Sequence, residues 1–229
     1  EISQKKQILS YTFLFGLFLM AGSLPYSKFL ISVSQGILLL SWLLDGDLKN
    51  KFSKFFKNKI ALSLTAVFLM HLIGLLYTSD CVYGLGDIKK KTPLLLLPLL
   101  FSTSAPLSKK MSEMLLSAFT ISVIIGTLIG FYILSGFIDR EILHPKQSSI
   151  FISHIRFGLM IALAVFVLFY FISTEIPVYL KVIASLLILW LMSFLIMMES
   201  ASGLGVLSVS YTHLRAHETK ANLVCRLLL

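Results

Sequence analysis

Long apolar segments fill most of this 229-residue chain, and short connections separate them. Most of these segments approach the roughly 20 apolar residues that a helix needs to cross the hydrocarbon core of a bilayer. Hydrophobic residues make up 57% of the chain and the mean hydropathy is +0.89, which is too apolar for a water-soluble domain. The sequence therefore predicts an all-α fold, a polytopic transmembrane helical bundle with about seven spans. The expected helices are residues 8–24, 29–44, 60–77, 84–102, 114–137, 157–173 and 178–198.

The basic residues of the connections predict the orientation of this bundle, because cytoplasmic loops carry more lysine and arginine. If the N-terminus lies inside the cell, more lysine and arginine residues fall on the cytoplasmic side than on the outer side. The difference comes mainly from residues 48–59, LKNKFSKFFKNK, which hold five lysines. This segment is either an amphipathic helix on an anionic leaflet or a plain solvated basic loop. Other basic residues, Lys91 and Arg156 among them, then fall on the outer side and suggest an anionic partner such as a lipid phosphate.

Several smaller signals concern local structure. Gly46, in the DGD sequence after the second segment, can supply a left-handed helix cap. Pro93 and Pro98 predict a kink in the helix expected over residues 84–102. Gly126 and Gly130 have the small-xxx-small spacing that favours close helix packing over a ligand role. His71 lies within an apolar segment, where an interhelical hydrogen bond is a more common role than catalysis.

The signatures of common soluble enzymes are absent from the sequence. It has no phosphate loop of the Walker type and no HExxH, GxSxG or CxxC motif. We therefore expect no metal, no cofactor and no nucleic-acid partner. The function has to be sought in the connections and at the polar ends of helices.

Three segments carry the polar groups that could act on a ligand. The first, GDIKKKTPLLLLPLLF at 86–101, places Lys91 at the start of a proline-containing helix, where it can hold a phosphate or simply reach the interface. The second, SHIRFGLMIALAV at 153–165, places His154 and Arg156 at a membrane boundary. There the arginine can bind a pyrophosphate, or simply anchor the end of the helix at the membrane interface. The third is MESASGLGVL at 198–207.

The last 21 residues, 209–229, have a different character. Their sequence, VSYTHLRAHETKANLVCRLLL, resembles the translation of a transposon-type sequencing adapter, with KAN covering the variable index. The alternative is a short amphipathic tail. We expect residues 209–229 to be an artefact, and residues 1–208 to be a partial transmembrane domain whose gene was cut at about Ser208.

The apolar and polar motifs together resemble a known family. Residues 72–102, LIGLLYTSDCVYGLGDIKKKTPLLLLPLLFS, and residues 152–168, ISHIRFGLMIALAVFVL, are similar to helices of bacterial O-antigen ligase and O-antigen polymerase proteins. ESASGLGVL, at 199–207, resembles the serine-arginine-x-glycine segment of that family, although Ala201 stands where a basic residue is common. The resemblance covers residues 72–207 and implies an O-antigen ligase-like domain within 1–208.

That resemblance implies an inner-membrane glycosyltransferase, with a helical fold of about a dozen spans in the bacterial cytoplasmic membrane. Such enzymes move a glycan from undecaprenyl diphosphate to the lipid A core, or to a growing glycan, and depend on a large late periplasmic loop that this sequence does not contain. We expect Lys91 and Arg156 to bind the diphosphate, with His154 nearby, and this part of the chain alone to be inactive. A polytopic transporter or polyprenyl-lipid flippase is the alternative, although its coupling ions would require more ionisable residues inside the helices.

Overall fold

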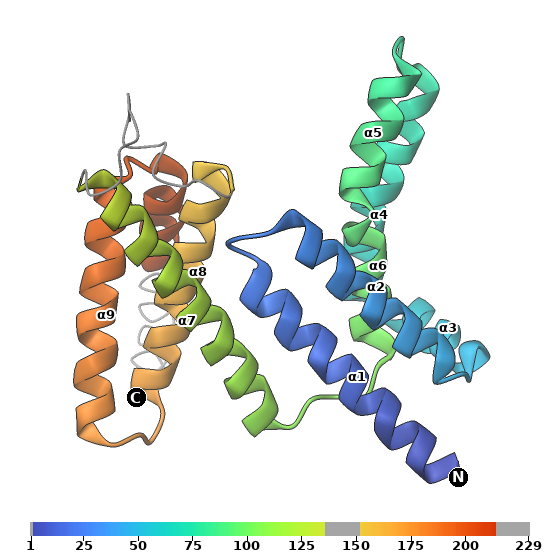
Figure 1. Cartoon of the computed structure of the whole chain (residues 1–229). Helices are drawn as coiled ribbons and strands as arrows, with labels where there is room; N and C mark the ends of the chain where they lie inside the picture. Colours follow the sequence, from blue (N-terminus) through green and yellow to red (C-terminus); the bar gives the residue numbers. More distant parts are fainter. Residues whose placement is uncertain (1, 136–151, 214–229) are drawn as a thin grey trace, which may run out of the picture. The chain divides into compact units, whose positions relative to one another are not determined.

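The computed structural model describes residues 2–135 and 152–213, and every regular element within these ranges is a helix (Figure 1). This confirms the all-α prediction. The chain divides into two compact units. The first comprises Glu1–Leu19 and Ser32–Met111, and the second comprises Met20–Ile31 and Ser112–Leu229. The expected boundary at Ser208 is not tested by this division and stays a prediction.

The described part of the chain has fewer candidate membrane spans than the seven expected. Four helices are long and apolar enough to cross a bilayer: Lys59–Tyr77, Lys109–Leu134, His154–Ser173 and Val178–Met197. The bent pair Lys28–Leu44 and Leu48–Lys57 makes a fifth if it is one broken span. Segments 8–24 and 84–102 are helical but do not qualify as spans. Polar residues lower the mean hydropathy of the helix that contains the first segment, and a break divides the second into two short helices. The count is therefore corrected to four or five, which is compatible with a multi-pass membrane protein.

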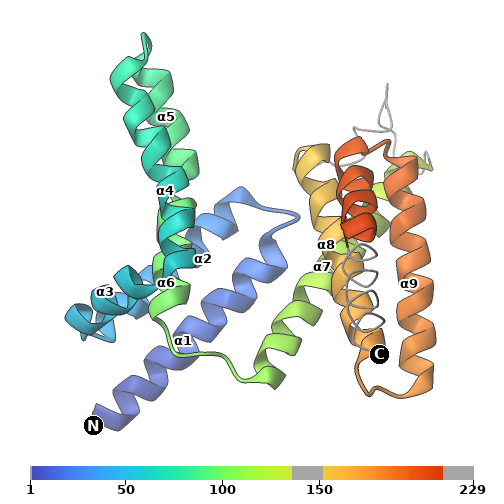
Figure 2. The same cartoon turned by 180° about the vertical axis from the view of Figure 1, so that it is seen from behind.

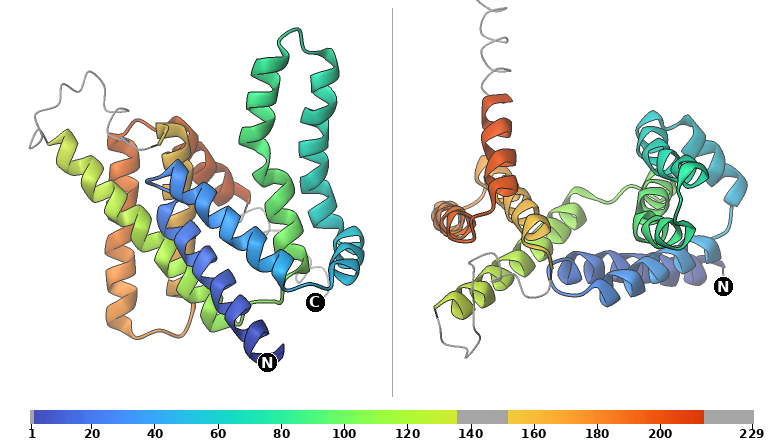
Figure 3. Two further views of the ribbon diagram at one scale, coloured as in Figure 1. Left: turned by 45° about the vertical axis from the view of Figure 1, so that its right-hand side comes forward. Right: turned by 90° about the horizontal axis from the view of Figure 1, so that it is seen from above.

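The first unit contains most of α1 and α2 and all of the helices from α3 to α6. Their bounds are α1 Ile2–Ser23, α2 Lys28–Leu44, α3 Leu48–Lys57, α4 Lys59–Gly74 with η1 Leu75–Tyr77, α5 Cys81–Lys91 and α6 Pro93–Thr103. Figure 3 shows α4 running beside α5 and α6 as a hairpin, and α3 packs against both α4 and α6. Asn58 caps α4, since its side-chain oxygen accepts hydrogen bonds from the amides of Ile60 and Ala61 at 3.1 and 3.2 Å.

A sharp turn joins α2 to α3, and the two helices are bent by 116°. Gly46 has φ 76° and Asp47 has φ 52°, so two successive residues are left-handed. The predicted left-handed cap at Gly46 is therefore confirmed, because glycine carries no Cβ to oppose that conformation. The helix α3 also excludes the plain-loop alternative for residues 48–57, whereas its placement on a leaflet stays a prediction.

The kinked helix expected over residues 84–102 is two helices, α5 and α6, separated by Thr92. Pro93 occupies the first turn of α6, a position that tolerates proline because its missing amide would have no helical partner. Pro98 lies inside α6. The prolines therefore predict that this helix is irregular, but not that it is interrupted and forms two separate helices.

The second unit is built mainly from α7 Lys109–Leu134, α8 His154–Ser173 and α9 Val178–Met197, followed by a helix over residues 201–213 (Figure 2). Its core lies where α8 and α9 pack together, around the fully buried Ile161, Leu191 and Leu195. Gly126 of α7 admits the ring of Phe157, which would lie 3.1 Å from an added Cβ. The predicted packing role of this glycine is therefore confirmed.

Candidate functional site

Lys91, the first predicted phosphate ligand, lies in the last turn of α5 and forms an ion pair with Asp87. The Lys91 Nζ atom is 2.5 Å from an Asp87 carboxylate oxygen, and both side chains are about one-third exposed. The hydrogen bond from Lys91 holds the pKa of the Asp87 carboxyl below its ordinary value of 3.8, and the nearby His71 and Lys90 act in the same direction. An anionic ligand would therefore compete with Asp87 for Lys91. The i, i+4 spacing of the two residues was the signal that could have predicted this pair.

We expect the pH dependence of Asp87 to report this pair. Because the folded-state pKa is lowered, the pair stabilises the fold above pH 3.8 and this contribution is lost as the pH falls through the lowered pKa. Carbon NMR titration of the Asp87 carboxyl should give a pKa below 3.8 in the parent protein and a return towards 3.8 in Lys91→Met. Lys90→Met should retain most of the lowering, and a Lys91→Met titration unchanged from the parent would contradict the pair.

His154 and Arg156, the other predicted ligands, lie in the first turn of α8. Arg156 is exposed and His154 is half-buried, while Ser153 precedes the helix without a side-chain cap. The first turn contains no acidic residue. Helix N-termini carry unpaired amides and a partial positive charge, so this end of α8 favours an anion. Lys91 belongs to the first unit and these two residues belong to the second, so their joint action on one ligand stays a prediction. Most of the polar connection at 139–156 lies outside the described residues.

The third predicted segment, at 198–207, is used for packing. Ser200 is 1% exposed, and Gly203 approaches Gly158 of α8 so closely that an added Cβ would lie 2.8 Å from the Gly158 carbonyl oxygen. Glu199 has φ 53° and reverses the chain between α9 and the helix at 201–213. The glycine of this motif therefore brings two helix backbones together.

The hydrogen-bond partner of His71 lies in its own helix and not in a neighbouring helix as expected. Its Nδ1 atom lies 2.7 Å from the carbonyl oxygen of Val67, one turn earlier in the same helix. This hydrogen bond is therefore within α4. Sequence position alone could not distinguish these two partners, because both satisfy a polar ring on an apolar helix.

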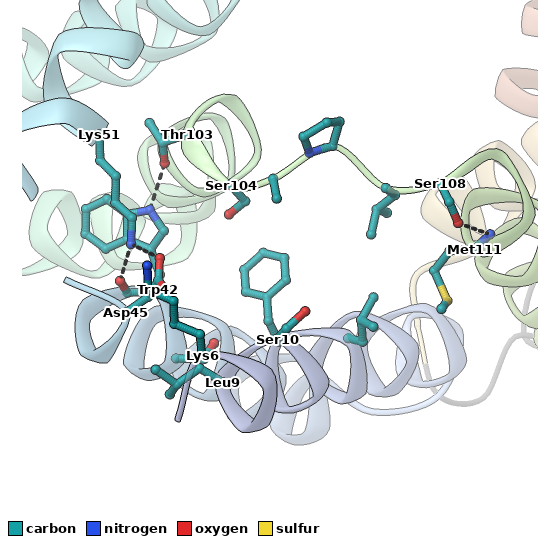
Figure 4. Close-up of a pocket in the computed structure, with 16 residues that line it drawn as sticks. Lys6, Leu9, Ser10, Trp42, Asp45, Lys51, Thr103, Ser104, Ser108 and Met111 are labelled. Carbon is teal, nitrogen blue, oxygen red and sulfur yellow. Dashed lines mark hydrogen bonds and ion pairs between the residues drawn. The ribbon is translucent and has the colours of Figure 1, made fainter. Parts of the chain in front are cut away.

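A polar pocket that the sequence did not predict lies within the first unit, with a volume of about 320 Å³. Three segments line it: the first half of α1, the α2–α3 turn and the connection from α6 to α7. Figure 4 shows Ser10 on α1 across the pocket from Ser104 of the connection, and Lys6 extending towards the end where Trp42 and Lys51 lie. The pocket thus collects lysines and hydroxyl groups from positions about one hundred residues apart in the chain.

An ion pair between a buried lysine and a partly exposed aspartate forms one end of this pocket. Lys51 is only 8% exposed, and its Nζ atom lies 2.9 Å from a carboxylate oxygen of Asp45 and 2.7 Å from the carbonyl oxygen of Trp42. The same ammonium lies 4.8 Å from the centre of the Trp42 ring. The indole N–H of Trp42 donates to the hydroxyl of Thr103 at 2.7 Å. These bonds join α2, α3 and α6, so the wall of the pocket is fixed by buried polar contacts.

Each unit also has an apolar pocket within the described residues. The first unit has a pocket of about 410 Å³ between α4 and α6, lined by residues such as Leu64 and Phe101. The second has one of about 350 Å³ between α7, α8 and α9, lined by residues such as Ile124, Leu168 and Ile183. Grooves of this character suit hydrocarbon chains, whether of lipids or of isoprenoids.

The chain matches no family model, no curated protein and no solved structure. Within residues 2–135 and 152–213, no group of three or more histidine, cysteine, aspartate or glutamate side chains is placed to hold a metal ion.

Proposed function

We propose that this chain is part of an inner-membrane glycosyltransferase of the O-antigen ligase or polymerase type. Such an enzyme transfers a glycan from undecaprenyl diphosphate to the lipid A core or to a growing glycan. The order of the three family-like segments over residues 72–207 carries the proposal. The described part of the chain is all-helical with four or five candidate spans, which is compatible with this proposal.

Arg156 has the properties expected of a residue that binds a diphosphate. Its guanidinium is exposed in the first turn of α8, where the unpaired helix amides also favour negative charge. A planar guanidinium can bind two phosphate oxygens at once and can stabilise the diphosphate as it leaves the sugar. His154 lies two residues away, and we propose that it contributes to the same binding site.

The apolar pocket between α7, α8 and α9 supports the proposal from the other end of the ligand. Its α8 residues, Leu168 and Phe171, are about 18 and about 22 Å along the helix from Arg156 at 1.5 Å per residue. A polyprenyl tail attached to a diphosphate at Arg156 would run along α8 and could enter this groove. A carrier lipid needs both a cationic end and an apolar path of this kind.

The proposal is tested in a strain that depends on the complete gene. Arg156→Ala and Lys91→Ala should each lower transfer about 10- to 100-fold, because a hydrogen bond to a charged group contributes about 1.5–3 kcal/mol. Surface glycan is scored by gel electrophoresis of lipopolysaccharide. Loss of all core-linked glycan would indicate a ligase, whereas cores carrying a single glycan unit would indicate a polymerase.

Two controls make the result specific. Arg156→Lys should retain part of the activity, because lysine keeps the charge but not the two-pronged geometry. Lys90→Ala should retain nearly all of it. Normal surface glycan in both alanine variants, at normal protein levels, would refute the proposed role of these residues.

A further inference from the structure

The polar pocket of the first unit lies at one end of its helices. Lys6, the turn from Asp45 to Lys51, and the connection after α6 all line it. The seven-span topology expected from the sequence places these same three segments on the cytoplasmic side, and in the structure they lie together around the pocket. α4 begins next to α3, and α6 ends where Thr103 accepts the hydrogen bond from Trp42. The pocket is therefore expected at the level of a membrane surface.

The helix α3 beside the pocket has the surface of a helix that lies in the interface. Leu48, Phe52 and Phe56 are exposed along one side, and Phe56 is 65% exposed. Exposed lysines occupy the remaining surface: Lys49, Lys54 and Lys57. An exposed apolar stripe flanked by lysines binds the boundary between headgroups and acyl chains of an anionic leaflet. The 116° bend after α2 is compatible with α3 lying across the direction of a membrane-crossing α2.

The charges of the pocket favour a ligand with one negative charge. Lys51 is neutralised by Asp45, whereas Lys6 is exposed and has no ion pair within the described part of the chain. Ser10 and Ser104 add hydroxyl groups that can donate to an anion, and both side chains are partly or fully accessible. The remaining lining is largely apolar and includes Leu9, Phe13, Leu14 and Leu107.

We propose that this pocket binds the phosphodiester headgroup of an anionic phospholipid from the leaflet on which α3 lies. Lys6 pairs with the phosphate, and the hydroxyls of Ser10 and Ser104 donate hydrogen bonds to its oxygens. The apolar walls contact the start of the acyl chains. Because a free phosphate ion would gain nothing from those walls, the mixed lining favours a lipid over the inorganic ion. This binding is independent of the glycosyltransferase proposal.

Trp42 provides a reporter inside the pocket. The chain has two tryptophans, and Trp190→Phe leaves Trp42 as the only one. The full chain is reconstituted into phosphatidylcholine vesicles that contain phosphatidylglycerol with brominated acyl chains, since bromine quenches indole fluorescence only at close range. Brominated phosphatidylglycerol should quench Trp42 at a lower mole fraction than brominated phosphatidylcholine does.

Neighbouring lysines provide a matched pair of variants. Lys6→Gln should lower the preference for phosphatidylglycerol about tenfold, which corresponds to the loss of one charge-assisted hydrogen bond. Lys5→Gln removes the same charge from the neighbouring residue, whose side chain does not line the pocket. Its effect should stay near or below about twofold, because salt screens a charge that makes no direct contact. Both residues are exposed, so neither change should impair folding.

Three outcomes would overturn the proposal. Equal quenching by the two brominated lipids would show that the pocket has no preference for an anionic headgroup. Equal losses in Lys5→Gln and Lys6→Gln would assign the preference to the general surface charge. Restoration of Trp42 fluorescence by inorganic phosphate in the buffer would identify a water-soluble ion as the ligand in place of a lipid.

Discussion

Gly203→Ala is expected to destabilise the protein by about 1–3 kcal/mol, the usual cost of adding a methyl group to a closely packed contact. An added Cβ would lie 2.8 Å from the carbonyl oxygen and 3.1 Å from the carbonyl carbon of Gly158. Both are backbone atoms of α8, so the clash can be relieved only by moving one helix away from the other. Thermal unfolding in detergent micelles measures the loss.

Gly205→Ala is the matched control, because it lies in the same helix at 201–213. An added Cβ at Gly205 meets no atom within 4 Å. Alanine also favours the helix over glycine by up to about 1 kcal/mol, so this variant should be neutral or more stable. Equal destabilisation by the two substitutions would contradict the close contact between Gly203 and Gly158.

Lys51→Met should destabilise the first unit by about 2 kcal/mol, because it removes a charged group that donates to both Asp45 and the Trp42 carbonyl. Removing one partner of a fully buried ion pair costs more, about 3–5 kcal/mol. Asp45 is 44% exposed and stays hydrated, so the smaller value applies. The loss is measured by thermal unfolding, and a shift in Trp42 emission should accompany it.

Lys54→Met is the corresponding control, since Lys54 is exposed on the same helix. It should change the free energy of unfolding by less than about 0.5 kcal/mol, as surface substitutions generally do. Lys51→Met combined with Asp45→Asn should cost less than the sum of the single changes, because the two residues share one interaction. Additive effects would show that the pair contributes nothing.

The helices of this fold could be predicted closely from apolar segments and their boundaries. The segment expected at 178–198 is the helix Val178–Met197, because Pro177 precedes it and the polar Glu199 follows. The number of spans could not be predicted equally well. Helicity follows from the apolar pattern, whereas membrane crossing also requires length and few charges, which the α5–α6 pair lacks.

The polar pocket could not be predicted from the sequence, and the reason is physical. Its wall depends on the bond between Trp42 and Thr103, which are 61 residues apart. Such a contact is set by the way α2, α3 and α6 pack, and no local spacing encodes it. Arg156, in contrast, lies at the start of a helix as the sequence predicts. Lys91 is predicted at the start of a helix but lies in the last turn of α5, where it pairs with Asp87.

The central claim is that this chain lies in a membrane with α3 on one side and the start of α5 on the other. Cys81, a free and exposed thiol at the start of α5, tests it directly once Cys225→Ser has removed the other cysteine. An impermeant thiol reagent added to intact spheroplasts should label Cys81. It should label a Ser53→Cys variant of α3, made with Cys81→Ser, only after the membrane is permeabilised. Labelling of both positions from the same side would contradict the account.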